Sequence, residues 1–280
     1  MKNIFLHGFT AGMRQWRIAA IVYVIQLCLA LTLGMQVYEV LKASIGNSLE
    51  IHKLLRHYDH TVLTDFLNIH GASITPLIGQ LRWLLLAWLL FSVFINGGLL
   101  TCAAAPQQAS WHLFWQGGAV YFTPFLKIGL LFLALALGWT AAVWLPAAAY
   151  LEPALEYFRS EAYVVWGVAL LLAVWLLGLG MLFGWSALSR LQRVQTGDPI
   201  RTCLRNGGRV FRQNKARFWG LLAGFTGLQL LLTAGYWLLE AWSGMTSPLG
   251  IVVFFGLQQA FVFCRILIRQ MLYSGMSMLV

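Results

Sequence analysis

The chain has 280 residues, of which 60% are hydrophobic and only 10% are charged, and its net charge is +10. Soluble domains carry about 25% charged residues on average, so these proportions would leave a soluble fold of this length without a polar surface. With a mean hydropathy of +0.73, the composition excludes a disordered chain, a disulfide scaffold and a soluble enzyme. It indicates an integral membrane protein.

A helix needs about 20 mostly apolar residues to cross a bilayer, and six stretches of the chain meet this length. We therefore predict an all-α membrane protein in which residues 1–280 form one polytopic domain. The first stretch follows a basic segment, as in a signal peptide. It has the length of a span and no small-residue cleavage site follows it, so we expect a retained helix. The predicted spans cover 18–38, 81–104, 128–150, 163–188, 218–242 and 248–264 onward.

The charges outside the spans are strongly asymmetric. If the amino end is cytoplasmic, the inner segments are 1–17, 105–127, 189–217 and the carboxyl end, and they hold 14 of the 19 basic residues but one of the nine acids. Basic loops stay in the cytoplasm, so we predict that both termini are cytoplasmic. The same asymmetry accounts for the net charge without a nucleic-acid partner.

A glycine-containing segment precedes each odd-numbered span. These elbow segments, 5–17, 114–127 and 204–217, mix apolar and polar residues, and each ends in a basic residue where its span begins. We interpret each as a short amphipathic helix in the inner interface, followed by a two-span hairpin, which gives three pseudo-repeats. The alternative is that any basic inner connection has this pattern. The glycines, which permit a bend or close packing, are Gly8, Gly117, Gly118, Gly207 and Gly208.

The third elbow segment carries a resemblance to known proteins. Residues 200–222 read IRTCLRNGGRVFRQNKARFWGLL. With the six-span pattern, this stretch resembles a recurring segment of the glycerophosphoryl diester phosphodiesterase membrane domain and of related bacterial six-span membrane proteins of unknown function. In that family the phosphodiesterase is a separate soluble domain, which this chain lacks. The resemblance therefore implies a fold and a location in the bacterial cytoplasmic (inner) membrane, but no activity.

The region 42–79 is the one sizeable outer segment. Apolar residues at helical spacing predict an outer amphipathic helix of about 20 residues, which Gly71 and Pro76 end. On its polar face His57 and His60 are three residues apart, a spacing that could place both on one metal ion. The alternatives are a solvated polar face and a pH sensor, and we expect no metal as a cofactor.

The inner loop 189–217 is the most basic segment of the chain. One interpretation is that its charge reflects the topology alone. The other is that it binds anionic lipid head groups, at about 1 kcal/mol for each basic side chain near the surface. The two interpretations are compatible. The candidate head-group-binding residues are Arg201, Arg205, Arg209, Arg212, Lys215 and Arg217.

Few polar residues occupy the spans. Asn96 in the second span and Gln258 and Gln259 in the sixth form a candidate intramembrane polar site, as in a transporter. The alternative is close packing in which Asn96 bonds to a neighbouring helix. Arg265 and Arg269 are expected to extend to the inner head groups. A candidate outer charge cluster, unless its members are separate interfacial charges, comprises Glu39, Arg82 and Glu240.

The sequence carries no recognisable catalytic motif, and no histidine falls in a span. The four cysteines are expected to be small core residues without disulfides. We therefore expect a non-enzymatic scaffold or accessory subunit that binds lipids of the phospholipid bilayer, anionic ones at the cytoplasmic face, or a membrane protein partner. The alternatives are a transporter or channel for a lipid-like or apolar solute, and an outer-face enzyme that acts on lipid through the region 57–65.

Overall fold

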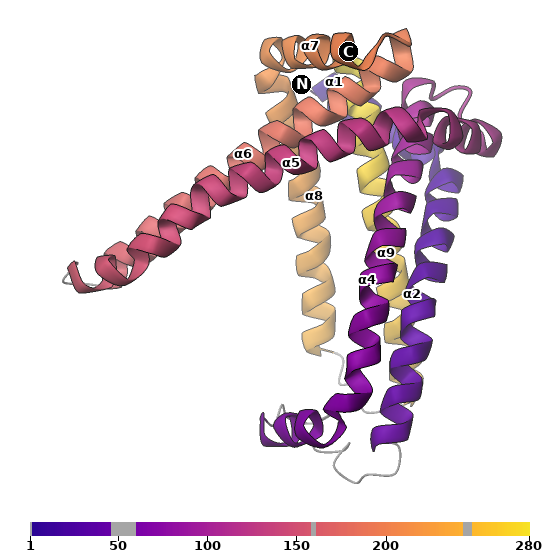
Figure 1. Ribbon diagram of the computed structural model, residues 1–280. Coiled ribbons are helices and arrows are strands. Elements are labelled where there is room, and N and C mark those ends of the chain that lie inside the picture. Colours follow the sequence, from indigo (N-terminus) through magenta and orange to yellow (C-terminus); the bar gives the residue numbers. More distant parts are fainter. Residues whose placement is uncertain (1, 46–59, 158–160, 243–247) are drawn as a thin grey trace. The chain divides into compact units, whose positions relative to one another are not determined.

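The computed structural model describes residues 2–45, 60–157, 161–242 and 248–280 (Figure 1). Within these ranges the regular elements are helices, with no strand. The helices are α1 (Lys2–Arg14), α2 (Trp16–Ile45), α4 (His60–Ala104), α5 (Trp111–Tyr157), α6 (Glu161–Thr196), α7 (Ile200–Gln213), α8 (Lys215–Trp242), α9 (Pro248–Met276) and a final 3-10 turn (Ser277–Leu279).

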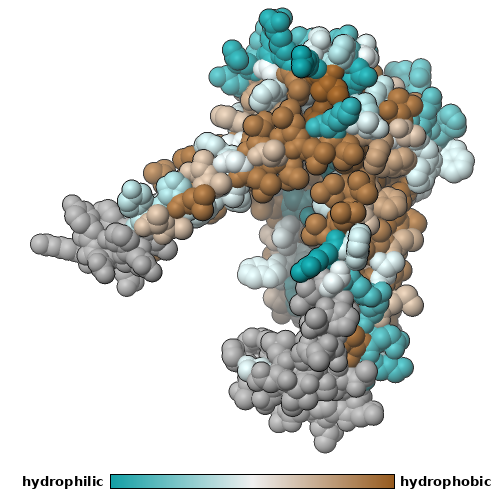
Figure 2. Space-filling view, in the orientation of Figure 1, coloured by the Kyte–Doolittle hydropathy of each residue, from teal (hydrophilic) through white to brown (hydrophobic). Residues whose placement is uncertain are grey.

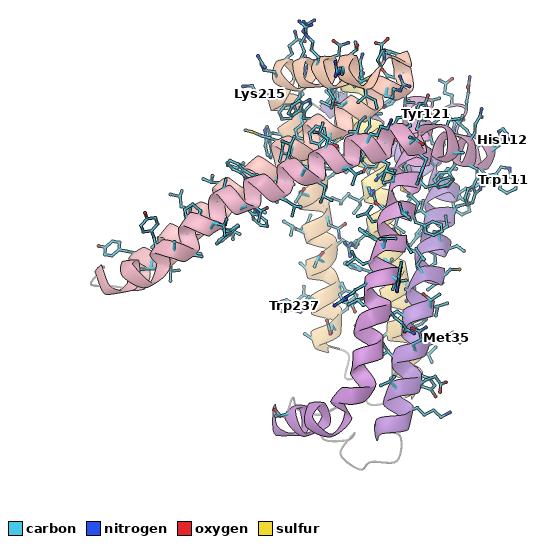
Figure 3. All side chains as sticks on the ribbon, in the orientation of Figure 1. Met35, Trp111, His112, Tyr121, Lys215 and Trp237 are labelled. Atoms are coloured by element: carbon cyan, nitrogen blue, oxygen red, sulfur yellow. The ribbon has the colours of Figure 1, made fainter. Side chains whose placement is uncertain are left out.

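Six helices contain apolar stretches long enough to cross a membrane, which confirms the predicted all-α, six-span fold. Large apolar side chains cover much of the helix surface. Figure 2 shows hydrophobic residues along the visible helices. Leu137 is 62% exposed, and Trp237, labelled in Figure 3, is 75% exposed. Exposed apolar side chains on long helices fit a lipid surround and not water. The spans are Trp16–Val40, Gly79–Ala104, Trp111–Tyr150, Ala162–Thr196, Lys215–Ala241 and Gly250–Leu279.

The chain divides into two compact units. One unit comprises 1–19 together with 93–280, and the other comprises 20–92. In the second unit, α4 runs without interruption through Gly71 and Pro76 into its span, so the prediction that these residues end an outer helix is wrong. Helices in membrane proteins tolerate proline and glycine more readily than helices in water do.

The helix breaks of the elbow segments do not fall at the glycines. The chain turns at Gln15, between α1 and α2, and at Asn214, between α7 and α8. Asn214 ends α7, with its backbone N–H donating to the carbonyl of Val210 at 2.9 Å, and its own carbonyl accepts from the N–H of Phe218 at 2.9 Å. The second elbow segment has no break, because α5 is continuous from Trp111. The expectation of three separate interfacial helices is therefore wrong for that segment.

The elbow glycines instead mark close packing against the ends of spans. Helix α1 packs on α9, and a Cβ added at Gly12 would lie 2.7 Å from the Cα of Met271. A Cβ at Gly117 of α5 would lie 2.6 Å from the Cβ of Thr101, near the end of α4.

The third elbow segment makes the same kind of contact. Helix α7 packs on α6, where a Cβ at Gly207 would lie 2.7 Å from the Cα of Ser189. One kind of contact thus recurs three times: the second and third elbow segments lie on the end of the preceding span, and α1 lies on α9. Of the two roles expected for these glycines, the structure shows close packing.

We predict opposite effects of alanine at two glycines. Gly12→Ala places a methyl group against the backbone of Met271, and such overpacking costs about 1–3 kcal/mol. Gly138→Ala places its methyl group in open space and gains about 0.5–1 kcal/mol of helix stability. Thermal unfolding of both variants in one detergent measures the difference. Equal midpoints would contradict the packing role of Gly12.

Candidate functional site

Helix α7 presents a basic face. Arg201, Arg205 and Arg209 follow one another at four-residue spacing and are exposed, because residues four apart lie on the same side of a helix. On the opposite side Cys203 and Gly207 are buried. Figure 2 shows hydrophilic residues gathered over the end of the molecule where Figure 1 places α7. All six predicted head-group residues are exposed, since Arg212, Lys215 and Arg217 are exposed as well.

Hydrogen bonds to α6 and to the α6–α7 loop fix the position of α7. The indole N–H of Trp185 donates to the carbonyl of Leu204 at 2.9 Å. In the loop, the guanidinium of Arg193 donates to the carbonyls of Gly197 and Asp198. Gly197 adopts φ 71, which glycine tolerates without steric cost. The basic face is therefore held in one orientation relative to α6.

The Cys203 thiol belongs to the same packed face of α7. It donates to the carbonyl of Asp198 at 3.2 Å, and burial raises the pKa of this thiol. A raised thiol pKa leaves little thiolate near neutral pH, so Cys203 is a structural side chain and a poor nucleophile. All four cysteines are free: Cys28, Cys102, Cys203 and Cys264.

A buried polar contact joins the turn after α1 to two spans. Gln15 is 3% exposed, and its amide N–H donates to the backbone carbonyl of Cys102 at 3.1 Å. The side-chain amide of Gln270, which is fully buried, donates to the side-chain carbonyl of Gln15. Because unpaired amides are costly in an apolar interior, these bonds fix how the first turn meets α4 and α9.

A second polar cluster forms around Asn96, which is buried. Its side-chain oxygen accepts from the Nη2 of Arg269 at 2.6 Å and from the hydroxyl of Tyr273 at 3.0 Å. The Nε of Arg269 also donates to the Tyr273 hydroxyl, at 3.3 Å. The guanidinium of Arg269 therefore turns toward α4. Arg265 is exposed and lies over the Phe261 ring.

The structure separates the other residues of the predicted intramembrane polar site. Gln258 is exposed and Gln259 is half-buried. Both precede Arg269 on α9 by about three helical turns. Asn96 is thus hydrogen-bonded to a neighbouring helix, α9. This is the close-packing arrangement that was the alternative to a transporter-like site.

The members of the predicted outer charge cluster fall in different compact units. Glu39 and Arg82 belong to the second unit and Glu240 to the first, and each is exposed. His57 and the side chain of His60 lie outside the described residues. Within the part of the chain that the structure describes, no three His, Cys, Asp or Glu side chains gather as a metal site would require.

These features define the class of the protein. Six long apolar helices make it an α-helical integral membrane protein. Comparisons with family models, with curated proteins and with solved structures find no match to the chain. Function is therefore inferred from the chain's own residues.

Sequence reasoning missed three residues of the polar clusters: Gln15, Gln270 and Tyr273. A signal was present, because Arg269, Gln270, Tyr273 and Ser274 crowd polar groups into one and a half turns of an otherwise apolar span.

We predict that Asn96→Ala destabilises the fold. The substitution removes the acceptor of two donors, the half-buried Arg269 guanidinium and the buried Tyr273 hydroxyl, which costs about 1–3 kcal/mol. Gln258→Ala, at an exposed position of the spans, is the matched control and is expected to change stability by less than about 0.5 kcal/mol. Thermal unfolding in detergent compares the two, and an unchanged midpoint for Asn96→Ala would rule out a structural role for its hydrogen bonds.

Proposed function

We propose that the protein is a non-enzymatic membrane component that binds anionic phospholipid head groups through the basic face of α7. The observation that carries this proposal is the exposure of all six basic side chains on and after α7, opposite a side that is packed against α6. No carboxylate competes on this helix, since α7 contains no acidic residue.

Electrostatics sets the expected strength of this binding. Each basic side chain near an anionic membrane surface contributes about 1 kcal/mol, and the attraction falls off within a Debye length. In the proposed orientation, both termini and α7 lie at the cytoplasmic face of a bacterial inner membrane. The chain would then act as a scaffold or accessory subunit that recruits anionic lipids or partner subunits at this face.

The alternatives gain no specific support. A transporter needs polar groups that are free to meet a solute, whereas the side-chain oxygen of Asn96 already accepts two hydrogen bonds. The hypothesis of an outer-face enzyme depends on His57 and His60. The side chains of both residues lie outside the described part of the structure. The weak resemblance to the phosphodiesterase membrane domain is compatible with lipid contact and supplies no activity.

Neutralising α7 tests lipid binding. We expect the triple variant Arg201→Gln, Arg205→Gln, Arg209→Gln to lose preference for phosphatidylglycerol over phosphatidylcholine by up to about 100-fold. The readout is the lipid composition that nanodisc-embedded protein recruits from mixed lipids, at low and at high salt. The matched control, Lys42→Gln with Arg82→Gln, removes two exposed charges outside α7. An unchanged preference in the triple variant, or an equal loss in the control, would refute the proposal.

Orientation is tested separately. Fusing a reporter that is active only in the cytoplasm to either terminus is expected to give activity at both ends, because 14 of the 19 basic residues lie in segments that share this side. A reporter that works only in the periplasm supplies the reciprocal measurement. Periplasmic activity at either terminus would overturn the proposed topology.

A further inference from the structure

The carboxyl ends of α6 and α9 lie together, because the side-chain amide of Gln195 donates to the backbone carbonyl of Ser277 at 3.5 Å. Arg190 of α6 and Arg269 of α9 stand one to about two helical turns before these residues. We propose that these two arginines form a binding site for one phosphate group, distinct from the basic face of α7. The proposal rests on the proposed function for one point only, the orientation in the membrane, which places these ends of α6 and α9 at the level of the head groups. It does not require α7 to bind lipid.

Arg190 is held in place without a hydrogen-bonded partner for its Nε. Its guanidinium lies over the Phe125 ring, 5.7 Å from the centroid, and a Cβ added at Gly129 would be 3.3 Å from Nη2. The absence of a side chain at position 129 thus leaves space for the guanidinium. The Nε atom is buried and has no acceptor among the described residues. An aromatic face stabilises a cation without using its N–H groups, so these donors stay available.

Arg269 is also only partly used. A guanidinium has five N–H donors, and the bonds of Arg269 go to two neutral groups, the Asn96 amide oxygen and the Tyr273 hydroxyl. These bonds hold the guanidinium in a defined position between α4 and α9. They leave its positive charge unneutralised.

The charge balance points to a missing anion. Within the described residues neither arginine is paired with a carboxylate: Arg190 contacts the Phe125 ring, and Arg269 bonds to Asn96 and Tyr273. Two like charges among apolar helices repel, and ionisable groups inside a membrane normally have a partner. One phosphate would neutralise both charges and accept the free N–H groups, because the planar guanidinium fork fits phosphate oxygens.

The phosphate could belong to a phospholipid or be free inorganic phosphate, and the full-length protein purified in mild detergent distinguishes the two. We expect native mass spectrometry to detect one phospholipid retained per chain. If the ligand is free phosphate, inorganic phosphate will instead raise the unfolding midpoint above that in chloride at equal ionic strength. Absence of both a retained phospholipid and a phosphate-specific shift would overturn the proposal.

Variants assign the ligand to this site. Arg190→Gln and Arg269→Gln are each expected to weaken phosphate or phospholipid retention by about tenfold or more. The matched control, Arg265→Gln, removes an exposed charge one helical turn before Arg269 on the same helix and is expected to keep the retained ligand. Arg190→Lys is a second test in case a Gln variant fails to fold. It keeps the positive charge but loses the planar guanidinium, so it should retain the ligand at a level between those of the wild type and Arg190→Gln. Wild-type retention in the Arg190 and Arg269 variants would refute this site and leave lipid binding by α7 intact.

Discussion

The close approach of helix backbones at the elbow glycines is the constraint on which the described bundle depends. A side chain at Gly12 or Gly207 would meet the Cα atom of a neighbouring helix at 2.7 Å. Lipid tails are as apolar as leucine, so spans gain little from burying apolar surface and depend on such small-residue packing. The same contact brings α1 onto α9, the first helix onto the last span.

The polar clusters follow from this packing. Once α1 lies on α9, the turn at Gln15 meets Gln270 and the end of α4. The amides then satisfy one another in a region where water is excluded. The neighbouring Asn96 fixes Arg269 by a 2.6 Å hydrogen bond. Helix packing and these hydrogen bonds together place the Arg269 guanidinium between α4 and α9.

Local sequence patterns predict part of this architecture and not the rest. The six spans follow from hydropathy, which is a property of each stretch alone, and the basic face of α7 follows from four-residue spacing. The orientation of the Arg269 side chain cannot be predicted from local pattern, because its partner Asn96 is 173 residues away in the sequence. The helix ends at Gln15 and Asn214 were also missed. Glycine permits a bend without requiring one. Here the elbow glycines allow close helix–helix packing instead.

The central claim is that α1 packs against the last two spans, and proximity cross-linking tests it most directly. The rings of Phe5 and Phe225 are stacked with centroids 4.6 Å apart. Cysteines at these two positions should therefore react with a short bifunctional thiol reagent in membranes, and peptide mass spectrometry should find the linked pair. A pair at Phe5 and the exposed Leu238, farther along α8, should not link. Failure of the first pair, or equal linking of both, would contradict the account.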